Sequence, residues 1–257
     1  MRIPFVKMHG AGNDFVLIDD RDASFPADGR VIAAIAPRGV GIGCEGVILV
    51  QASQSADFRM RFFNPDGSEA DMCGNGARCV AAFARETGAA RSDRMRFETR
   101  AGEVEAEIVG PELVRISLPD PRDLGENFVN SGVPHAIVPV DDLSAADVEG
   151  EGRRIRFSAE YAPDGTNVDF VAYEPPGRLS IRTYERGVEA ETGACGTGSV
   201  AAALVGVAQH GLVFPVRVKT ALGYELVVDG AWDGRAFSRV TLTGPVKRVF
   251  EGVVELP

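Results

Sequence analysis

Cys73-Gly74-Asn75-Gly76 and Cys195-Gly196-Thr197-Gly198 are two copies of one short pattern, a cysteine followed by a Gly-x-Gly turn. An alanine-rich run of helical composition follows each copy, at residues 77–85 and 198–210. The second run contains no charged residue, so a helix there would be buried on every side. The pattern therefore predicts that each half of the chain holds a central helix with a cysteine at its start.

The elements that precede the two cysteines also repeat in order. A glycine loop leads into an apolar strand at residues 10–18, and the same combination recurs at residues 131–140. An alternating apolar and polar strand follows in each half, at residues 57–63 and 179–184. Repetition over the length of a domain predicts two similar α/β domains, each packing strands against a central helix.

The expected fold is a mixed α/β (α+β) architecture of two pseudo-symmetric domains. Each is a curved, mostly antiparallel sheet wrapped round its helix, with the active site in the cleft between them. Pro119-Asp120-Pro121 interrupts the strand pattern, so we expect residues 1–119 and 245–257 in one domain and residues 120–244 in the other. Further expected elements are a helix at residues 30–36 and strands at residues 47–50, 68–72, 94–98, 103–109, 113–118, 168–173, 216–220, 224–228, 238–243 and 246–249.

Charge and composition exclude several classes of function. The 257 residues carry a net charge of −10, and no basic cluster could follow a nucleic-acid backbone. The longest uncharged run, residues 192–216, is interrupted by glycines and a proline, so it predicts a buried helix and no membrane span. The N-terminal residues 1–10 lack the apolar core of a signal peptide. We therefore expect a cytoplasmic protein.

The four cysteines lie at positions 44, 73, 79 and 195, and no two have CxxC spacing. This spacing argues against a zinc site or a redox motif, and it fits reduced thiols in the cytoplasm. The chain has three histidines, none of which pairs with another in the sequence. We therefore expect no metal, and we interpret His135 as a packed, orienting residue.

A cysteine at a helix start can become reactive. Unpaired N–H groups and the partial positive charge of the helix N-terminus favour the thiolate form. The neighbouring glycines let a ligand approach those N–H groups, which can also hold a carboxylate. Each half would thus supply an activatable thiol beside an anion site. The alternatives are that Cys73 and Cys195 are simply small buried residues, or that they form a disulfide.

Two opposed thiols suit the inversion of a carbon that bears a weakly acidic hydrogen. A thiolate on one face removes the proton, and a thiol on the other face returns one. Preorganised donors around the substrate carboxylate would have to stabilise the developing carbanion in a site closed to water. Nothing in the sequence demands pyridoxal phosphate, so no cofactor is expected.

Several stretches resemble the diaminopimelate epimerase family, in order and from residue 3 to the final strand. They are residues 7–15 (KMHGAGNDF), 63–69 (FNPDGSE), 73–79 (CGNGARC), 184–187 (YERG) and 194–198 (ACGTG). The resemblance implies a cofactor-independent epimerase that interconverts LL- and meso-2,6-diaminopimelate for lysine and peptidoglycan synthesis. It also implies domain closure, a homodimer with Phe250 near the contact, and a last strand that returns to the first domain.

The resemblance assigns roles to individual residues. Cys73 and Cys195 would be the two bases, and His135 and Glu185 would support the thiol chemistry. The reacting carboxylate would be bound by the pairs Gly74-Asn75 and Gly196-Thr197. The non-reacting end of the substrate would be bound by Asn13, Asn64, Asn167 and Arg186, with Glu185 suited to an ammonium group.

Two positions depart from the family pattern. Many members have asparagine where this chain has Val133, and some have glutamine where it has Gly46. The departures concern the substrate-binding end rather than the thiols. Two alternatives therefore stay open: a racemase of the same fold that acts on another amino acid without pyridoxal phosphate, and a non-enzymatic thiol-disulfide sensor.

Overall fold

The computed structural model describes residues 1–256, which form two compact units. The first contains Met1–Ile116 together with the C-terminal segment from Gly244, and the second contains Ser117–Thr243. The boundaries expected from the sequence are 119/120 and 244/245. The chain passes from one unit to the other twice, so the first unit is built from both ends of the sequence.

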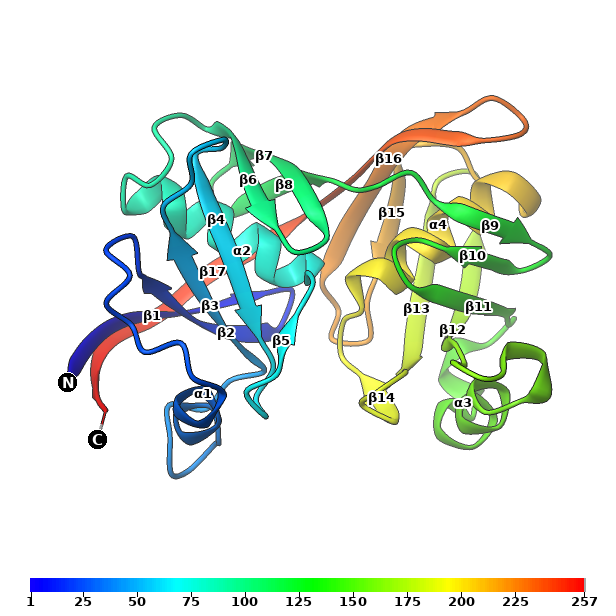
Figure 1. Ribbon diagram of the computed structural model, residues 1–257. Helices are drawn as coiled ribbons and strands as arrows, with labels where there is room; N and C mark the ends of the chain where they lie inside the picture. The colour runs from blue at the N-terminus through cyan, green and yellow to red at the C-terminus, as the bar shows by residue number, and fades with distance from the viewer. Residues whose placement is uncertain (257) are drawn as a thin grey trace. The chain divides into compact units, whose positions relative to one another are not determined.

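Strands surround a central helix in the first unit (Figure 1). Its elements are β1 (Arg2–Gly10), β2 (Asn13–Asp19), α1 (Gly29–Ile35), β3 (Gly46–Gln51), β4 (Phe58–Phe63), β5 (Glu69–Ala70), α2 (Gly74–Glu86), β6 (Arg94–Thr99), β7 (Gly102–Gly110), β8 (Leu113–Ser117) and the C-terminal part of β17 (Phe237–Glu255). Helix α2 contacts β1, β2, β3, β4 and β7. Strand β17 pairs with both β1 and β8, so the sheet curls into a ring around α2.

The second unit encloses helix α4 in the same way (Figure 1). Its elements are β9 (Arg122–Gly125), β10 (Phe128–Asn130), β11 (Pro134–Pro139), α3 (Val148–Arg156), β12 (Asn167–Glu174), β13 (Arg178–Glu185), β14 (Ala190–Thr192), α4 (Gly196–Gln209), β15 (Val216–Lys219), β16 (Glu225–Trp232) and the first part of β17, with short 3-10 turns at Leu143–Ala145 and Ala159–Tyr161. Helix α4 contacts β10, β11, β12, β13, β15 and β16. In the part of the chain that the structure describes, no helix has the length and apolarity needed to span a membrane.

Each central helix begins directly after its cysteine, as predicted. Cys73 is the N-cap of α2 and Cys195 is the N-cap of α4, both with extended backbone conformation. Alanines fill much of both helices, and they combine high helix propensity with little bulk. Gly88 and Gly211 follow the C-caps with φ of +72° and +73°, a conformation that favours glycine. Both helices are therefore specified at each end by local sequence.

The strand pairing confirms the internal repeat. In the first unit β2 pairs with β3 and β4 with β6 in parallel, and in the second β11 pairs with β12 and β13 with β15 in parallel. Most of the remaining pairs are antiparallel, including β1–β2, β3–β4, β10–β11 and β12–β13. The two units therefore share one topology, as the doubled cysteine pattern indicated.

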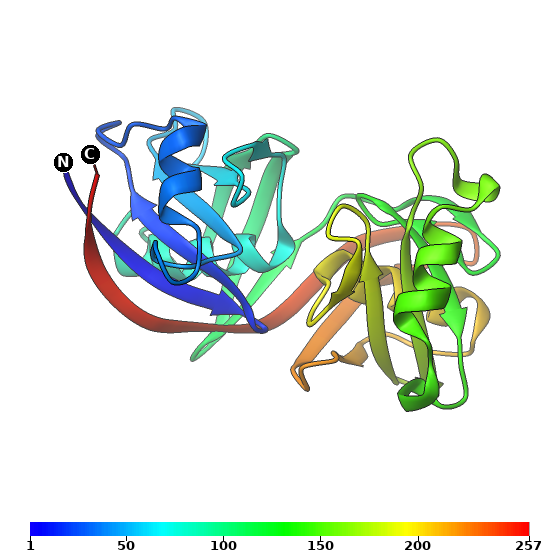
Figure 2. The same cartoon turned by 90° about the horizontal axis from the view of Figure 1, so that it is seen from below.

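Helices α1 and α3 occupy matching places outside their sheets (Figure 2, blue and green). Helix α1 joins a core cluster with residues of β2 and β3, and α3 packs on β12 and β13. The sequence predicted α1 but not α3, because Gly150 and Gly152 make α3 a poor helix by propensity. A Cβ at Gly152 would lie 2.6 Å from the Tyr184 Cβ, so this helix needs glycine to approach the sheet.

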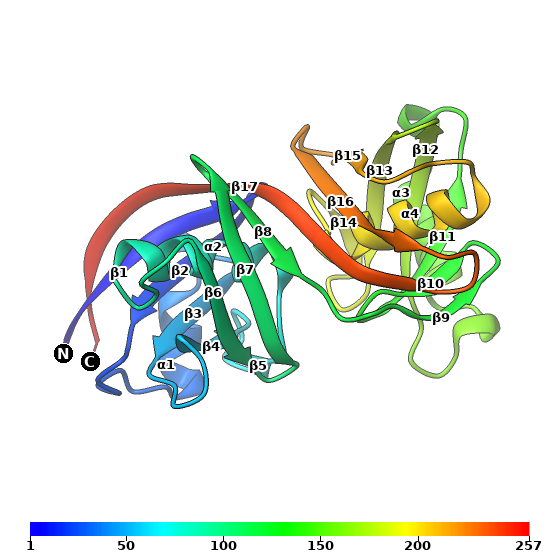
Figure 3. The ribbon, with the colours of Figure 1, turned by 90° about the horizontal axis from the view of Figure 1, so that it is seen from above.

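Strand β17 corrects one prediction. Two strands were expected at residues 238–243 and 246–249, but one 19-residue strand spans Phe237–Glu255. Gly244-Pro245 does not break it, because β17 pairs with β16 up to Thr243 and with β1 from Val246, so the proline falls where the neighbour changes. In the first unit β17 runs along β1 to the chain ends (Figure 3), where the Met1 amino group donates to the Leu256 carbonyl at 2.9 Å.

Two smaller differences concern short strands. Strands β9 and β10 were not predicted, because four-residue and three-residue segments carry too little periodicity to be recognised. The strand expected at residues 68–72 is reduced to the two residues of β5. The tight turn that precedes β5, with Gly67 at φ +88°, leaves little length for pairing before the chain enters α2.

Candidate active site

The first cysteine motif lies where the glycine loop of β1 and β2 meets the start of α2. The loop packs closely, since a Cβ at Gly10 would lie 2.8 Å from the Asn75 carbonyl oxygen. This contact brings Asn13 to Cys73, whose Sγ lies 3.9 Å from the Asn13 Oδ1. Cys73 is only partly buried, and its side chain does not cap the helix. The thiol therefore stands beside the N–H groups of the first turn and one amide oxygen.

A network of charged side chains contacts Asn13 and orients its amide. The Asn13 amide donates to Glu45, and Arg38 lies 3.7 Å from Glu45 and 2.6 Å from Asp14. Lys7 also contacts Asp14, at 2.6 Å. Although burial favours the neutral acid, hydrogen bonds from Arg38 and Lys7 keep the pKa of Asp14 below its usual value. Burial and the charge of Asp14 raise the pKa of Glu45. The network fixes the orientation of the Asn13 amide.

The second cysteine lies in a more enclosed and more acidic environment. Cys195 is 9% exposed, and its Sγ accepts a hydrogen bond from the Gly198 N–H at 3.3 Å. Burial raises the pKa of the Cys195 thiol well above its ordinary value, and the nearby Glu185 and Asp169 raise it further. The hydrogen bonds that Cys195 forms with the Thr197 hydroxyl and with the Gly198 N–H act in the opposite direction. Cys195 therefore needs assistance to ionise.

A chain of hydrogen bonds leads from Cys195 to a buried carboxyl group. The Cys195 Sγ lies 3.5 Å from the Thr197 Oγ1, which lies 3.0 Å from His135 Nε2. His135 Nδ1 lies 2.7 Å from Asp169 Oδ2, and Thr183 donates to Asp169 Oδ1 at 2.6 Å. The side chains of His135 and Asp169 have no exposed surface. One assignment that fits these contacts places the imidazole proton on Nδ1, facing Asp169, and leaves Nε2 to accept from the Thr197 hydroxyl.

Three further predicted residues lie together at the paired ends of β12 and β13. Asn167 Oδ1 accepts from the Arg186 backbone N–H at 2.8 Å, and its amide donates to the Pro134 carbonyl at 3.1 Å. The Arg186 guanidinium donates to the Gly165 carbonyl at 3.3 Å. Glu185 accepts a hydrogen bond from Thr192 at 2.8 Å. Within residues 1–256, the Arg186 guanidinium forms no ion pair with a carboxylate, so its positive charge is not balanced by a neighbouring acid.

Each unit thus assembles its own part of the predicted set. Cys73, Asn13, Gly74 and Asn75 lie together in the first unit, and Asn64 lies in the turn after β4, where its amide donates to Ser68 at 3.1 Å. The second unit brings together Cys195, Gly196, Thr197, His135 and Glu185, with Asn167 and Arg186 at the neighbouring strand ends. That Cys73 and Cys195 face one substrate stays a prediction.

Two residues near the candidate site were not predicted from the sequence. Asp169 lies in β12 among residues that are buried on both faces of the strand, so alternation gave no signal that this acid is buried. Arg78 lies in α2 and is fully buried, where it donates to Asn75 Oδ1 at 2.6 Å and to the Gly74 carbonyl at 3.2 Å. Its position in an alanine-rich helix gave no indication of burial.

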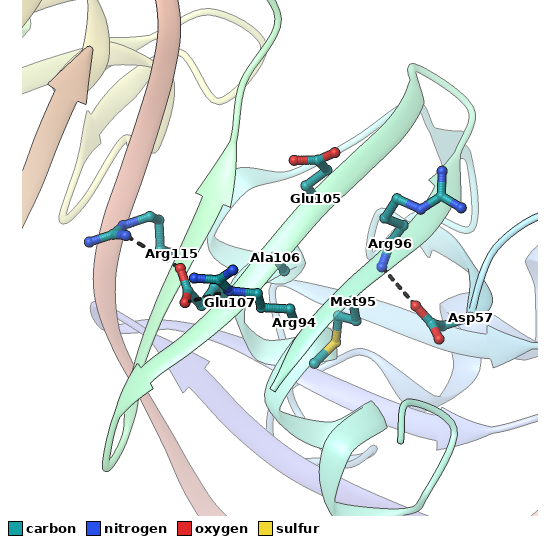
Figure 4. Close-up of a pocket in the computed structure, with 8 residues that line it drawn as sticks. All are labelled: Asp57, Arg94, Met95, Arg96, Glu105, Ala106, Glu107 and Arg115. Atoms are coloured by element: carbon teal, nitrogen blue, oxygen red, sulfur yellow. Dashed lines mark hydrogen bonds and ion pairs between the residues drawn. The ribbon is translucent and has the colours of Figure 1, made fainter. Parts of the chain in front are cut away.

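A separate hollow of about 430 Å³ lies on the strands β6, β7 and β8, away from the cysteine motifs. Figure 4 shows that its charged side chains contact one another: Glu107 lies 2.9 Å from Arg94 and 3.4 Å from Arg115. The Arg96 backbone N–H donates to Asp57 at 2.8 Å. These side chains compensate each other on a solvated sheet face and offer no reactive group.

No disulfide joins any of the four cysteines, all of which lie in the described part of the chain, and Cys44 and Cys79 are buried away from solvent. Within residues 1–256, no three histidine, cysteine or acidic side chains are grouped so as to hold a metal ion. The two helix-start thiols and the polar residues around them remain the site predicted from the sequence.

Comparison with known proteins identifies the family. The sequence model of diaminopimelate epimerase matches residues 5–118 and 127–249. The chain belongs to the diaminopimelate epimerase family. A diaminopimelate epimerase from Chlorobaculum tepidum is 42% identical over 260 residues, covering 97% of this chain and 100% of the relative. Like its relatives in the diaminopimelate epimerase family, the chain is an isomerase.

Solved structures confirm the expected fold class. A PhzF-family phenazine biosynthesis protein from Bacillus anthracis superposes with a TM-score of 0.76 at 17% identity, covering 100% of both chains. A probable proline racemase from Agrobacterium radiobacter gives 0.69 at 18% identity, covering 99% of this chain and 93% of the other. At such low identity the likeness concerns the fold alone. The far higher identity to diaminopimelate epimerases favours that family over the racemase alternative.

Proposed function

We propose that the protein interconverts LL- and meso-2,6-diaminopimelate without a cofactor, with Cys73 and Cys195 acting on opposite faces of one α-carbon. The observation that carries the proposal is the matched placement of the two thiols, each the N-cap of the central helix of its unit. Membership of the diaminopimelate epimerase family names the substrate.

The proposed reaction is a transfer of protons through two thiols. One thiolate takes the α-proton, so the C–H bond breaks, an S–H bond forms, and the electron pair spreads toward the adjacent carboxylate. The opposite thiol then gives its proton to the other face, and its own S–H bond breaks. Backbone N–H groups of Gly74, Asn75, Gly196 and Thr197 would stabilise the carboxylate, because the N-terminus of a helix carries partial positive charge. No redox partner is needed.

His135, oriented by Asp169, would accept the proton of Cys195 when this thiol ionises. The chain of contacts through Thr197 connects the thiol to an imidazole that a buried carboxyl group orients. When Cys195 has to act as the base, its proton can move through the Thr197 hydroxyl toward His135 Nε2. Glu185 would add a negative charge that the substrate ammonium group can balance. These roles make His135 and Glu185 supporting residues rather than acceptors of the α-proton.

The far end of the substrate carries a second ammonium and a second carboxylate. Arg186 suits the carboxylate because, among residues 1–256, its guanidinium is bound only to backbone carbonyls, and Asn13, Asn64 and Asn167 supply amide groups. Val133, which is half-buried in the loop before β11, cannot supply the amide that many family members have there. The proposal therefore assigns the distal carboxylate to Arg186 and the remaining asparagines.

Solvent deuterium incorporation tests the proposal directly. In D₂O, the enzyme should place deuterium on the α-carbon of LL-diaminopimelate as the meso isomer accumulates, followed by NMR or mass spectrometry. Lysine and glutamate serve as controls and should remain unlabelled. Exchange into another amino acid but not into diaminopimelate would support the racemase alternative. A stable Cys73–Cys195 disulfide with no exchange into any amino acid would support the thiol-disulfide sensor.

Thr197 offers a test of the hydrogen-bond chain. Thr197→Val keeps the shape of the side chain but removes the hydroxyl between Cys195 and His135, so kcat is expected to fall about tenfold or more. Thr197→Ser keeps the hydroxyl and is expected to stay within about threefold of the wild type. Steady-state rates at pH 7 distinguish the two variants. Equal rates for valine and serine would show that the chain carries no proton.

The proposed homodimer has a candidate surface in the first unit. A groove of about 690 Å³ is lined by α1 and by strands β1 and β17, and it includes Val40, Phe250 and Val253. These three side chains are 90%, 47% and 50% exposed. Apolar surface of this kind is typical of a protein interface, and a second copy of the chain would cover it.

Phe250→Glu is expected to shift the dimer to a monomer at micromolar concentration, because a charge would be buried in the apolar contact. Leu222→Glu is the control, since Leu222 is also exposed at 58% but lies outside the groove. Light scattering after size-exclusion chromatography measures both masses. A Phe250→Glu variant that remains dimeric would contradict this placement of the interface.

The cellular role follows from the proposed chemistry. meso-Diaminopimelate would serve lysine and peptidoglycan synthesis. We place the enzyme in the cytoplasm because the proposed function requires reduced thiols, and no disulfide joins any of the four cysteines.

A further inference from the structure

Arg78 is a buried cation without a buried anion. Its side chain has no exposed surface, and its two hydrogen-bond acceptors, the Gly74 carbonyl and the Asn75 side-chain oxygen, are both neutral. The Arg78 Nε has no hydrogen-bond partner among the described residues, and none of their ion pairs includes this guanidinium. An uncompensated buried charge is costly, so a compensating anion is expected nearby in the working enzyme.

The ionisable groups that interact electrostatically with the Arg78 guanidinium are the thiols of Cys79 and Cys73. Burial lowers the pKa of Arg78 to about 10, and Cys79 and Cys73 act against that shift. Arg78 therefore stays protonated at neutral pH. Burial raises the pKa of Cys79 far above its ordinary value, so this second thiol stays neutral. Cys73, which is partly exposed at the helix start, is the thiol that can become the anion.

Other charged groups on the strands around α2 are already compensated. Asp14 on β2 is bound by Lys7 and Arg38, and Arg61 on β4 forms an ion pair with Glu69 at 2.9 Å. His9 on β1 accepts a hydrogen bond from the Gly12 N–H through Nδ1. Strand β3 has no charged residue, Arg59 on β4 pairs with Glu98, and the glutamates of β7 lie on its solvated face. Arg78 is thus the uncompensated charge closest in sequence to Cys73.

In the second unit, the charged groups near the cysteine are acidic rather than basic. The residue that corresponds to Arg78, five positions after the cysteine, is Val200. The charged groups that act on Cys195 are the carboxyl groups of Glu185 and Asp169. One thiol therefore has a buried cation behind its helix start, and the other has acidic neighbours. The repeat preserves the position of the two cysteines but not their electrostatics.

We propose that Arg78 is a positioning residue that sets the resting state of the enzyme, with Cys73 as the thiolate and Cys195 as the thiol. The inference rests on the proposed two-thiol function and assigns the protonation state of its free form. The buried guanidinium stabilises a negative charge at the start of α2. It also holds the Gly74 carbonyl and the Asn75 side chain, so it fixes the first turn whose N–H groups face the substrate.

Alkylation of the free enzyme measures this state. Iodoacetamide rates at Cys73 and Cys195 are followed from pH 6 to 10 by peptide mass spectrometry, which reads both thiols in one sample. The pH midpoint reports ionisation independently of accessibility. In the wild type, the midpoint of Cys73 is expected at least one unit below that of Cys195, which is about a tenfold difference in thiolate. A lower midpoint for Cys195 would overturn the proposal without any variant.

Two substitutions of Arg78 then test the contribution of its positive charge. Arg78→Met removes it and should raise the Cys73 midpoint by about one unit or more, whereas Arg78→Lys should restore at least half of that shift. The Cys195 midpoint should stay unchanged in both variants. A folded Arg78→Met with the wild-type Cys73 profile would refute the role of Arg78. If deuterium exchange fails while these shifts occur, the epimerase proposal is wrong and the assignment of Arg78 stands.

Discussion

Cys73→Ser and Cys195→Ser are each expected to lower net epimerisation by about a thousandfold or more. A serine hydroxyl ionises far too weakly to take an α-proton, and general acid–base catalysis of this kind contributes about 10²- to 10⁴-fold. Loss of either partner should stop inversion, because a base on one face needs an acid on the other. Conversion of LL- to meso-diaminopimelate, resolved by chiral chromatography, measures the effect.

Cys79→Ala is the matched control for these two substitutions. Cys79 lies in the same helix as the Cys73 motif and is fully buried, and the corresponding residue of α4 is Ala201. The second unit therefore already accommodates alanine at this place, and activity should stay within about threefold of the wild type. Wild-type rates in either serine variant would exclude the two-thiol mechanism.

Gly198→Ala is expected to damage both stability and catalysis. A Cβ at this position would lie 2.5 Å from Asp169 Oδ1, closer than real Cβ contacts. Asp169 cannot move away freely, because Thr183 and His135 hold its two oxygens at 2.6 and 2.7 Å. The clash should lower the free energy of unfolding by about 1–3 kcal/mol, despite the better helix propensity of alanine. It should also lower kcat/KM at least about tenfold by displacing the Cys195 hydrogen bonds.

Gly76→Ala is the equivalent change in the first unit. Its new Cβ would meet the Ile48 Cδ1 at 3.0 Å and the Met60 Cε at 3.4 Å, which are the ends of flexible side chains. These side chains can shift, so the free energy of unfolding should change by less than about 1 kcal/mol. Chemical denaturation and kinetics of both variants provide the comparison. Equal losses at the two positions would contradict the view that Asp169 is rigidly held.

Much of the fold could be predicted because it depends on local patterns that occur twice. The helix after each cysteine, the glycine that ends each helix and the alternating strands are all visible in short windows of sequence. The failures have local causes as well. Helix α3 contains two glycines, and β17 contains Gly244-Pro245, so propensity predicted a break where contacts with distant strands impose order.

The candidate site was predictable in its residue types but not in its electrostatics. The sequence indicated Cys73, Cys195, His135 and the polar residues around them, and the structure places each near a helix start or a strand end. The sequence did not indicate Arg78 or Asp169, since the burial of a charged side chain depends on which strands cover it. Those strands are separated from it by many residues of chain.

The sequence by itself determined the doubled topology and the position of a thiol at the start of each central helix. Helix caps, glycine turns and strand alternation depend on neighbours within a few residues, so they can be recognised without a structure. Only the tertiary structure decided what surrounds each thiol. Long-range packing buries a guanidinium beside Cys73 and an imidazole–carboxyl pair beside Cys195, and it thereby makes two similar motifs electrostatically different.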